Sequence, residues 1–235
     1  NNLAHTRACV ESVWRHSRQP FELIVVDNGS TDGTAEWLRA SGVTVLSNER
    51  NQGYPIACNQ GMAVAKGEIV VLLNNDALVG PEWLERLTAP FKNPVVGMVG
   101  PMTCDGAVGQ DAGPLHYIPG ETFDAAAQAW AVKHDRQTHE TDELIGFCVA
   151  IRREVLDRIG GLDPAFGLGN YDDIDYSRRA KLAGFSCVIA EDVLVHHHGS
   201  ATFKAEGVDY GRLLNLNRGL YQRKWRHIER QADPA

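Results

Sequence analysis

Apolar runs of strand composition alternate with helix-like stretches through the first hundred residues, and this alternation limits the folds open to the chain. The strand-like runs lie at 21–26, 42–48, 68–73 and 95–102. Helical patterns lie between them at 34–38, 54–67 and 80–91. Such alternation predicts an α/β fold, with a mainly parallel sheet covered by helices on both faces. In these sheets, ligands bind beyond the carboxyl ends of the strands.

A long polar stretch interrupts this order in the second half. Residues 105–142 contain Gly, Pro and three His without a clear period, except for a helix-like segment at 125–132. Further strands are predicted at 143–153 and 186–199, and further helices at 153–161, 173–185 and 210–226. We find no internal repeat, and we expect a single domain over residues 1–235. Loops as long as 105–142 are usually functional in a compact domain.

Composition and charge favour a soluble globular protein. Of the 235 residues, 43% are hydrophobic and 23% are charged, as is usual for such proteins. The net charge of -7 argues against nucleic acid as the main partner, because phosphate binding needs a basic field. No apolar run approaches the roughly 18 residues of a membrane span, and no signal peptide is visible. Five scattered cysteines predict reduced thiols, disfavour a zinc site and lead us to expect a cytoplasmic protein.

The strand predicted at 68–73 ends on two amides and a carboxylate, Asn74, Asn75 and Asp76. One interpretation is a simple turn, because Asn and Asp favour turns. The alternative is a metal site, because a carboxylate at the carboxyl end of a strand can hold Mg²⁺ or Mn²⁺. The cation would then bind a diphosphate.

The strand predicted at 21–26 is followed by Asp27, Asn28 and Gly29. These residues suit a turn with a helix cap, but they also suit nucleobase binding. A carboxylate can accept an N–H of a pyrimidine, and Gly29 would let the base approach the backbone. Neither a GxGxxG motif nor a phosphate-binding GxxxxGK[ST] loop occurs, which disfavours ordinary dinucleotide and ATP sites.

Two further clusters of chemically active side chains lie in the second half. Asp172, Asp173 and Asp175 stand at a predicted helix N-terminus, where the helix dipole favours one or two carboxylates. A third carboxylate in the same turn is better explained if one of the three takes a proton from a hydroxyl. Residues 196–198 are three histidines at the end of a strand. One of them could complete a metal site with Asp76, although a core or surface role is the alternative.

The order of these motifs resembles the family 2 glycosyltransferases, which are inverting enzymes with the GT-A fold. The resemblance covers nearly the whole chain. It rests on the segments ELIVVDNGSTDGT, NERNQGYPIACNQGMAVAKGEIVVLLNNDALVGPEWL, GFCVAIRREVLDRIGGLDPAFG, YDDIDYSRRAKLAGF and VHHHGSAT. It implies a single GT-A domain with a nucleotide-sugar-binding half at 1–103 and an acceptor half at 104–235.

The resemblance implies a set of donor-binding residues in the first half. Asp27 would read the nucleotide base, with Asn28 and Gly29 beside it. Asn51 and Gly53 would line the nucleotide pocket. Asn74, Asn75 and Asp76 occupy the DxD position of the family, where Asn74 replaces the first aspartate as in the rhamnosyltransferase-like branch. Asp76 would be a ligand of Mg²⁺ or Mn²⁺.

In the second half, the resemblance implies the catalytic residues. Asp173 would be the catalytic base, and Asp172 stands where the family often has glutamate. His197 would be the second metal ligand, with His196 and His198 as alternatives because the register is ambiguous. The implied reaction moves a sugar from a UDP- or dTDP-linked donor to a hydroxyl of a glycan or lipid-linked acceptor, as in the synthesis of cell-surface polysaccharide.

The chain departs from the family pattern at its start, and two alternative functions are also considered. The family usually opens with an apolar strand inside the sheet, whereas this chain opens on a helix-like NNLAHTRACVESV. A sugar nucleotidyltransferase and a catalytically silent nucleotide-sugar-binding module are the alternative functions. The basic end of the last helix could touch an anionic membrane or simply face solvent. Its residues are Arg218, Arg223, Lys224 and Arg226.

Overall fold

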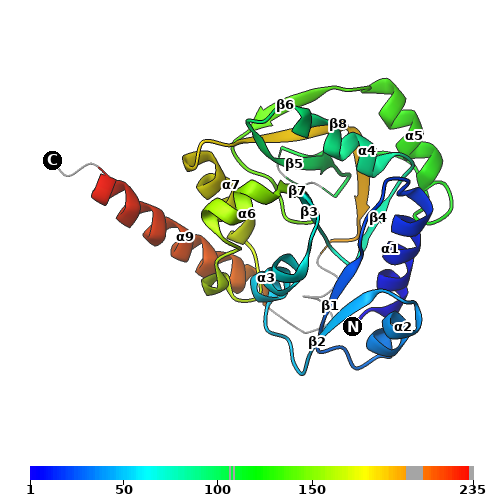
Figure 1. Ribbon diagram of the computed structural model, residues 1–235, viewed down its shortest axis with the longest axis horizontal. Helices are drawn as coiled ribbons and strands as arrows, with labels where there is room; N and C mark the ends of the chain where they lie inside the picture. The colour runs from blue at the N-terminus through cyan, green and yellow to red at the C-terminus, as the bar shows by residue number, and fades with distance from the viewer. Residues whose placement is uncertain (106, 108, 200–208, 233–235) are drawn as a thin grey trace.

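The computed structural model describes the whole chain except residues 106, 108, 200–208 and 233–235. Its main sheet has the strand order β3-β7-β5-β8-β4, and β6 also pairs with β8 (Figure 1). These strands are β3 (Ile69–Leu73), β4 (Ala77–Val79), β5 (Val96–Met102), β6 (Thr138–Thr141), β7 (Cys148–Arg152) and β8 (Ser186–His197). The edge strand β3 and the inner strands β5 and β8 point the same way, as predicted, and β7 runs antiparallel between β3 and β5.

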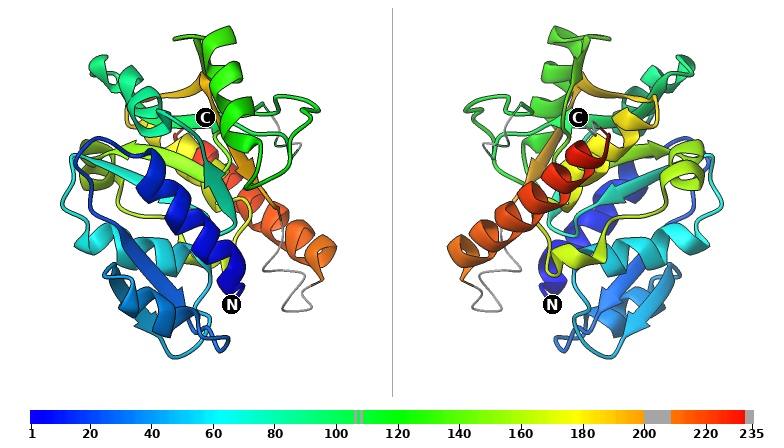
Figure 2. Two further views of the ribbon diagram at one scale, coloured as in Figure 1. Left: turned by 90° about the vertical axis from the view of Figure 1, so that its right-hand side faces the viewer. Right: turned by 90° about the vertical axis from the view of Figure 1, so that its left-hand side faces the viewer.

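A second, smaller sheet consists of β1 (Ile24–Asn28) and β2 (Thr44–Asn48), which pair in parallel. The helices α2 (Thr34–Ala40) and α3 (Tyr54–Val64) pack against this small sheet, whereas α1 (Leu3–His16) packs against β4 of the main sheet. The others are α4 (Trp83–Thr88), α5 (Phe123–Lys133), α6 (Arg153–Ile159), α7 (Asp172–Leu182) and α9 (Tyr210–Ala232). Two short 3₁₀ helices cover Ala89–Lys92 and Pro164–Phe166. Helices α1 and α9 cover opposite sides of the molecule (Figure 2).

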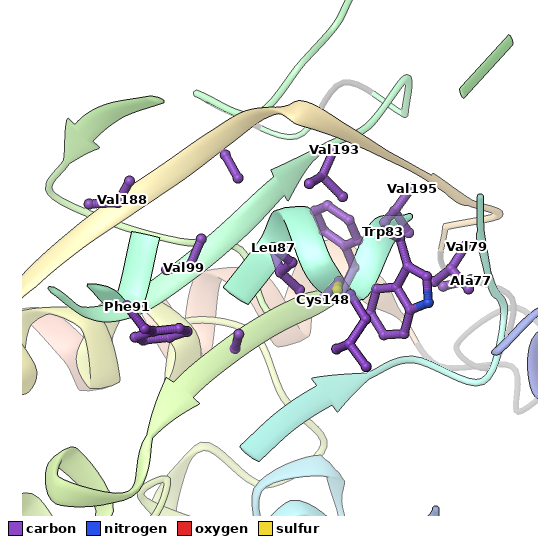
Figure 3. Packing of buried hydrophobic residues seen from close by; sticks show 14 of the residues in the cluster. Ala77, Val79, Trp83, Leu87, Phe91, Val99, Cys148, Val188, Val193 and Val195 are labelled. Carbon is purple, nitrogen blue, oxygen red and sulfur yellow. The ribbon is translucent and has the colours of Figure 1, made fainter. Parts of the chain in front are cut away.

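Apolar side chains fill both faces of the main sheet. On one face, Trp83, Leu87 and Phe91 pack on strand residues such as Val99 and Val195 (Figure 3). On the other face, a second cluster joins α3, α6 and α7 to the sheet. Strands covered on both faces read as nearly continuous apolar runs, which is why β5 and β7 were recognisable in the sequence. The α/β class is confirmed.

A cavity of about 1190 Å³ separates the two sheets, with β1 along one side and β3 along the other. Within the described part of the chain, β1 pairs only with β2, and β3 pairs only with β7. The opening strand of the family therefore has no counterpart among these residues, and no other described segment takes its place. The facing edges of β1 and β3 thus border a partly apolar cleft that continues to the carboxyl ends of both strands.

Most predicted elements lie where the sequence places them, and the differences concern short or polar segments. The helix predicted at 125–132 is part of α5, and the last helix continues to residue 232. Two strands were missed. β4 has only three residues, and β6 is a mostly exposed Thr-His-Glu-Thr strand with no apolar alternation. In the part of the chain that the structure describes, no helix is both long and apolar enough to cross a membrane. All five cysteines are free thiols, as expected.

Candidate active site

Side chains from four separate elements line the cleft between the sheets. Asp27 lies at the end of β1, and Asp76 lies between β3 and β4. Asp173 lies in the first turn of α7, and His197 ends β8. Asn28, Asn51, Asn74, Asn75 and Asp172 also line this cleft. The structure thus brings together the side chains that the sequence singled out.

A network of amides joins the loops that follow β1 and β2. The side chain of Asn28 donates to Oδ1 of Asn51 at 2.8 Å and accepts from Nδ2 of Asn48 at 2.9 Å. Nearby, the buried Asp27 accepts the backbone N–H of Ser30 at 3.3 Å. These contacts fix the two loops relative to each other at the mouth of the cleft.

Gly29 and Gly53 allow these loops to approach other backbone segments closely. Both have left-handed backbone angles, with φ of 84° and 92°. A Cβ on Gly29 would lie 2.7 Å from Cα of Arg50, and one on Gly53 would lie 2.1 Å from the carbonyl oxygen of Gly167. Both positions therefore exclude a side chain because of neighbouring backbone.

The short strand β4 brings Asp76 beside the end of β8. Nε2 of His197 lies 3.3 Å from Oδ1 of Asp76 and 3.2 Å from Nδ2 of Asn74. Asn75 instead turns toward α1, where its amide donates to the hydroxyl of Thr6 at 2.9 Å. Of the three DxD-position side chains, Asn74 and Asp76 thus face the histidine.

The three histidines alternate across β8, as side chains of a strand must. His196 packs away from Asp76, where its Nδ1 lies 2.8 Å from the hydroxyl of Tyr117. The ring of His198 lies 4.3 Å from that of His5. Only His197 among the three has an ion-pair contact with Asp76 in the described residues. The geometry therefore favours His197 over the two alternatives as a metal ligand.

Opposing effects set the protonation of the Asp76–His197 pair. Burial disfavours the charged imidazole, but hydrogen bonds to Asp105 and Asp76 outweigh it and raise the pKa of His197 to about 9. Burial also opposes ionisation of Asp76, yet its contact with His197 holds the pKa of that carboxyl below its usual range. A cation that replaced the imidazole proton would find an ionised carboxylate already in place.

The donor set suits a cation shared with a phosphate ligand. In the described residues, no group of three or more His, Cys, Asp and Glu side chains is arranged to hold a metal ion. Asp76 and His197 nevertheless point their donor atoms at each other across 3.3 Å. Two adjacent ligands about 2.1 Å from one cation lie about 3 Å apart. A divalent ion with one or two protein ligands normally completes its shell with water and substrate phosphates.

Asp173 is held in place by backbone donors at the start of α7. Its Oδ2 accepts the N–H of Gly146 at 2.9 Å, and its Oδ1 accepts the N–H of Ile174 at 2.9 Å. Burial raises the pKa of this carboxyl, although the backbone hydrogen bonds oppose the rise. A carboxylate of raised pKa is a stronger base than an ordinary aspartate once it is ionised.

The neighbouring Asp172 is more deeply buried, with 2% of its surface exposed. Its Oδ2 has no hydrogen-bond partner within the described residues. Burial, followed by the charge of Asp173, raises its pKa well above the usual range. Asp175, the third carboxylate of the cluster, serves the fold instead, because it is buried against Arg179, Lys224 and Trp225.

One residue at this site, Asp105, was not predicted from the sequence. Asp105 follows β5, and its Oδ2 lies 2.5 Å from Nδ1 of His197. It was counted only as the first residue of the polar segment 105–142. Its position just beyond the carboxyl end of a predicted strand, like that of Asp27, was the available signal.

A mixed α/β sheet with carboxylates at its strand ends around one cleft defines the GT-A class of fold, and solved structures agree. A GalNAc-T7 crystal structure with UDP, GalNAc and Mn²⁺ aligns with a TM-score of 0.62 and 19% identity, covering 80% of this chain and 40% of that one. The mannosyltransferase PcManGT of Pyrobaculum calidifontis, solved with GDP-Man and Mn²⁺, aligns with a TM-score of 0.63 and 22% identity. This alignment covers 87% of the present chain and 57% of PcManGT.

The family model described as glycosyl transferase family 2 matches residues 1–160. The chain therefore belongs to glycosyltransferase family 2, and the resemblance seen in the sequence is confirmed.

Curated relatives match over most of this chain. Protein y4gI of Sinorhizobium fredii is 33% identical and aligns with 100% of this chain. The O-antigen biosynthesis protein RfbC of Myxococcus xanthus is 29% identical over 86% of it. The chain spans only 27% and 17% of these two proteins. An N-acetylglucosaminyl-diphospho-decaprenol L-rhamnosyltransferase of Mycobacterium tuberculosis is 27% identical, covering 83% of this chain and 72% of that protein.

Proposed function

We propose that this chain is an inverting glycosyltransferase domain, which moves a hexosyl or deoxyhexosyl group from a UDP- or dTDP-linked donor to an acceptor hydroxyl. The observation that carries the proposal is the meeting of Asp27, Asp76, His197 and Asp173 on one cleft. The names of two relatives, an O-antigen biosynthesis protein and a decaprenol-linked rhamnosyltransferase, support a glycan or lipid-linked acceptor in cell-surface polysaccharide synthesis.

The donor would bind to the half formed by residues 1–103, and the acceptor to the half formed by 104–235. Asp27 offers a buried carboxylate for an N–H of the base. The amide network of Asn28 and Asn51 keeps the surrounding loops in place. The diphosphate would then extend along the cleft toward Asn74 and Asp76, at the end of β3.

Asp76 and His197 would hold the Mg²⁺ or Mn²⁺ ion. When bound, such a cation stabilises the negative charge of a departing diphosphate. Both structural neighbours were solved with Mn²⁺, which supports a cation of this kind. Asn74 supplies an uncharged amide beside His197, so the site carries one carboxylate fewer than a complete DxD motif.

Asp173 would act as the general base. The acceptor hydroxyl would approach the anomeric carbon from the face opposite the diphosphate, and Asp173 would take its proton as the new bond forms. One displacement of this kind inverts the anomeric configuration and needs no covalent enzyme nucleophile. The pKa of Asp173, which burial raises, suits a residue that must accept a proton.

The proposal is tested by donor turnover. The protein is incubated with a panel of UDP- and dTDP-sugars and Mn²⁺, and release of the nucleoside diphosphate is measured. Asp173→Asn should retain donor binding but lose at least about two orders of magnitude in turnover, as expected for loss of a general base. Asp76→Ala should abolish the metal dependence of nucleotide binding.

The alternative functions give different results in the same assay. A sugar nucleotidyltransferase would release pyrophosphate from a nucleoside triphosphate and a sugar phosphate. A silent binding module would bind a nucleotide sugar without turnover. Full turnover by Asp173→Asn would remove that residue from the proposed role.

A further inference from the structure

Asp105 lies behind His197, on the side of the imidazole ring away from Asp76. Its Oδ2 is 2.5 Å from Nδ1 of His197, while Nε2 of the same ring is 3.3 Å from Oδ1 of Asp76. The two ring nitrogens therefore each face a different carboxylate. Nε2 points into the proposed cation site, and Nδ1 faces Asp105, which is far from His197 in the sequence.

The Asp105 carboxylate is itself fixed at both oxygens. Its Oδ1 accepts the backbone N–H of Ala107 at 3.3 Å, and its Oδ2 faces the imidazole. Its side chain is 20% exposed, and that of His197 is 13% exposed. The imidazole ring also stacks on Phe147, with 5.3 Å between centroids and 22° between planes. These contacts leave the ring little freedom to rotate.

A neutral imidazole can bind a cation only through the nitrogen that lacks a proton. A carboxylate at Nδ1 favours the tautomer with the proton on that atom, which leaves the lone pair on Nε2. The amide of Asn74, 3.2 Å from Nε2, is a hydrogen-bond donor and suits a lone pair there. Oδ1 of Asp76 also faces Nε2, at 3.3 Å, and favours a proton on that atom when no cation is bound. When a cation takes the place of this proton, the carboxylate of Asp105 at Nδ1 favours the Nδ1–H tautomer.

We propose that Asp105 is a positioning residue of the cation site, which holds His197 in the Nδ1–H tautomer and aims its Nε2 at the cation shared with Asp76. This inference rests on the proposed function, because it takes Asp76 and His197 as metal ligands. It assigns a role to the segment after β5, which the sequence left as an unexplained polar excursion. Asp105 itself does not touch the cation.

The test measures Mn²⁺ affinity, by electron paramagnetic resonance of free Mn²⁺, with Mn²⁺ alone and with Mn²⁺ plus UDP. Asp105→Ala should weaken Mn²⁺ binding about 10- to 100-fold, the usual cost of losing such a partner. Asp105→Asn keeps an acceptor oxygen and should fall between this variant and wild type. Asp111→Ala is the matched control, because it removes one exposed carboxylate from the same segment.

Nitrogen-15 NMR of the protein with Mg²⁺ and UDP gives a second readout, which a merely structural role would not change. Wild type should show His197 protonated at Nδ1, and Asp105→Ala should show a mixture of tautomers. Circular dichroism verifies that each variant is folded. If Asp105→Ala does not fold, the same comparison is made with Asp105→Asn.

The outcomes distinguish the positioning role of Asp105 from the proposed cation site. If Asp76→Ala loses Mn²⁺ while both Asp105 variants bind like wild type, the positioning role is wrong and the proposed cation site stands. An equal loss in Asp111→Ala and Asp105→Ala also overturns the positioning role. If wild type binds no Mn²⁺, or Asp76→Ala binds it unchanged, the proposed cation site falls and this inference falls with it.

Discussion

Asp172 is a buried carboxyl whose ionisation works against the fold. Burial and the charge of Asp173 raise its pKa well above the usual range. The folded protein therefore holds this proton more tightly than the unfolded chain does. Stability then falls as the pH rises from the unfolded pKa of about 3.9 toward the raised folded pKa, and it stays lower above that window. The carboxylate is retained at a cost in stability, as is common in active sites.

Asp172→Asn should consequently raise the melting temperature at pH 7.5. The gain should shrink as the pH is lowered toward 4, because the wild-type side chain is then neutral as well. Thermal unfolding of both proteins between pH 4 and pH 8 measures this difference. Asp157→Asn, at an exposed position on α6, is the control for a general charge effect. A variant less stable than wild type at neutral pH would contradict the expectation.

The sequence identified most of the candidate site, because strand ends are visible as abrupt changes from apolar to polar residues. Asp27 and Asp76 both follow such strands. The sequence could not predict which of the three histidines lies beside Asp76. This depends on how β4 pairs with β8, and in the structure Ala77 pairs with His197. Asp105 was missed for a similar reason, since its contact spans 92 positions of the chain.

The terminal helix α9 holds the loop that leads into α7. Asn217, which is 7% exposed, donates its amide to the carbonyl oxygens of Phe166 at 2.8 Å and Gly169 at 2.7 Å. This loop contains Asn170 and Tyr171 with φ of 72° and 69°, a left-handed backbone that Asn tolerates but that is unfavourable for Tyr. The helix thus stabilises a strained approach to Asp172 and Asp173.

Asn217→Ala should lower the free energy of unfolding by about 1–3 kcal/mol, because it removes the amide donor from the carbonyl oxygen of the buried Gly169 and one of two donors from that of Phe166. Faster hydrogen exchange in residues 166–171 should accompany this loss. Asn215→Ala, at an exposed position of the same helix, separates the effect from a change in helix propensity. Equal behaviour of the two variants would show that α9 does not hold the loop.

Two of the basic side chains at the end of α9 form contacts within the protein. Lys224 pairs with Asp163 at 2.7 Å and with Asp175 at 2.8 Å, and Arg218 donates to the hydroxyl of Tyr171 at 2.9 Å. Contact of this end with an anionic membrane remains a proposal, and it depends on the exposed Arg223 and Arg226. The internal pairs explain two of the four basic residues without a membrane.

At the scale of the molecule, the two sheets differ in how they are supported. β5 and β7 lie inside the six-stranded sheet with apolar clusters on both faces. Among the described residues, β1 has a single neighbouring strand, and it borders the 1190 Å³ cavity on its other side. A two-stranded sheet is marginal by itself, so β1 and β2 depend on the helices packed against them.

Hydrogen exchange followed by mass spectrometry should therefore show lower protection in residues 24–28 and 44–48 than in 96–102 and 148–152. Addition of UDP and Mn²⁺ should raise protection in the first two segments, because a ligand that binds only the folded form opposes their opening. The central strands serve as the internal control, since strands buried in a core are expected to open only near the global free energy of unfolding. Equal protection of the two sheets without ligand would mean that the cavity does not weaken the small sheet of β1 and β2. If UDP raised protection only in the acceptor half, the proposed base-binding role of Asp27 would be contradicted as well.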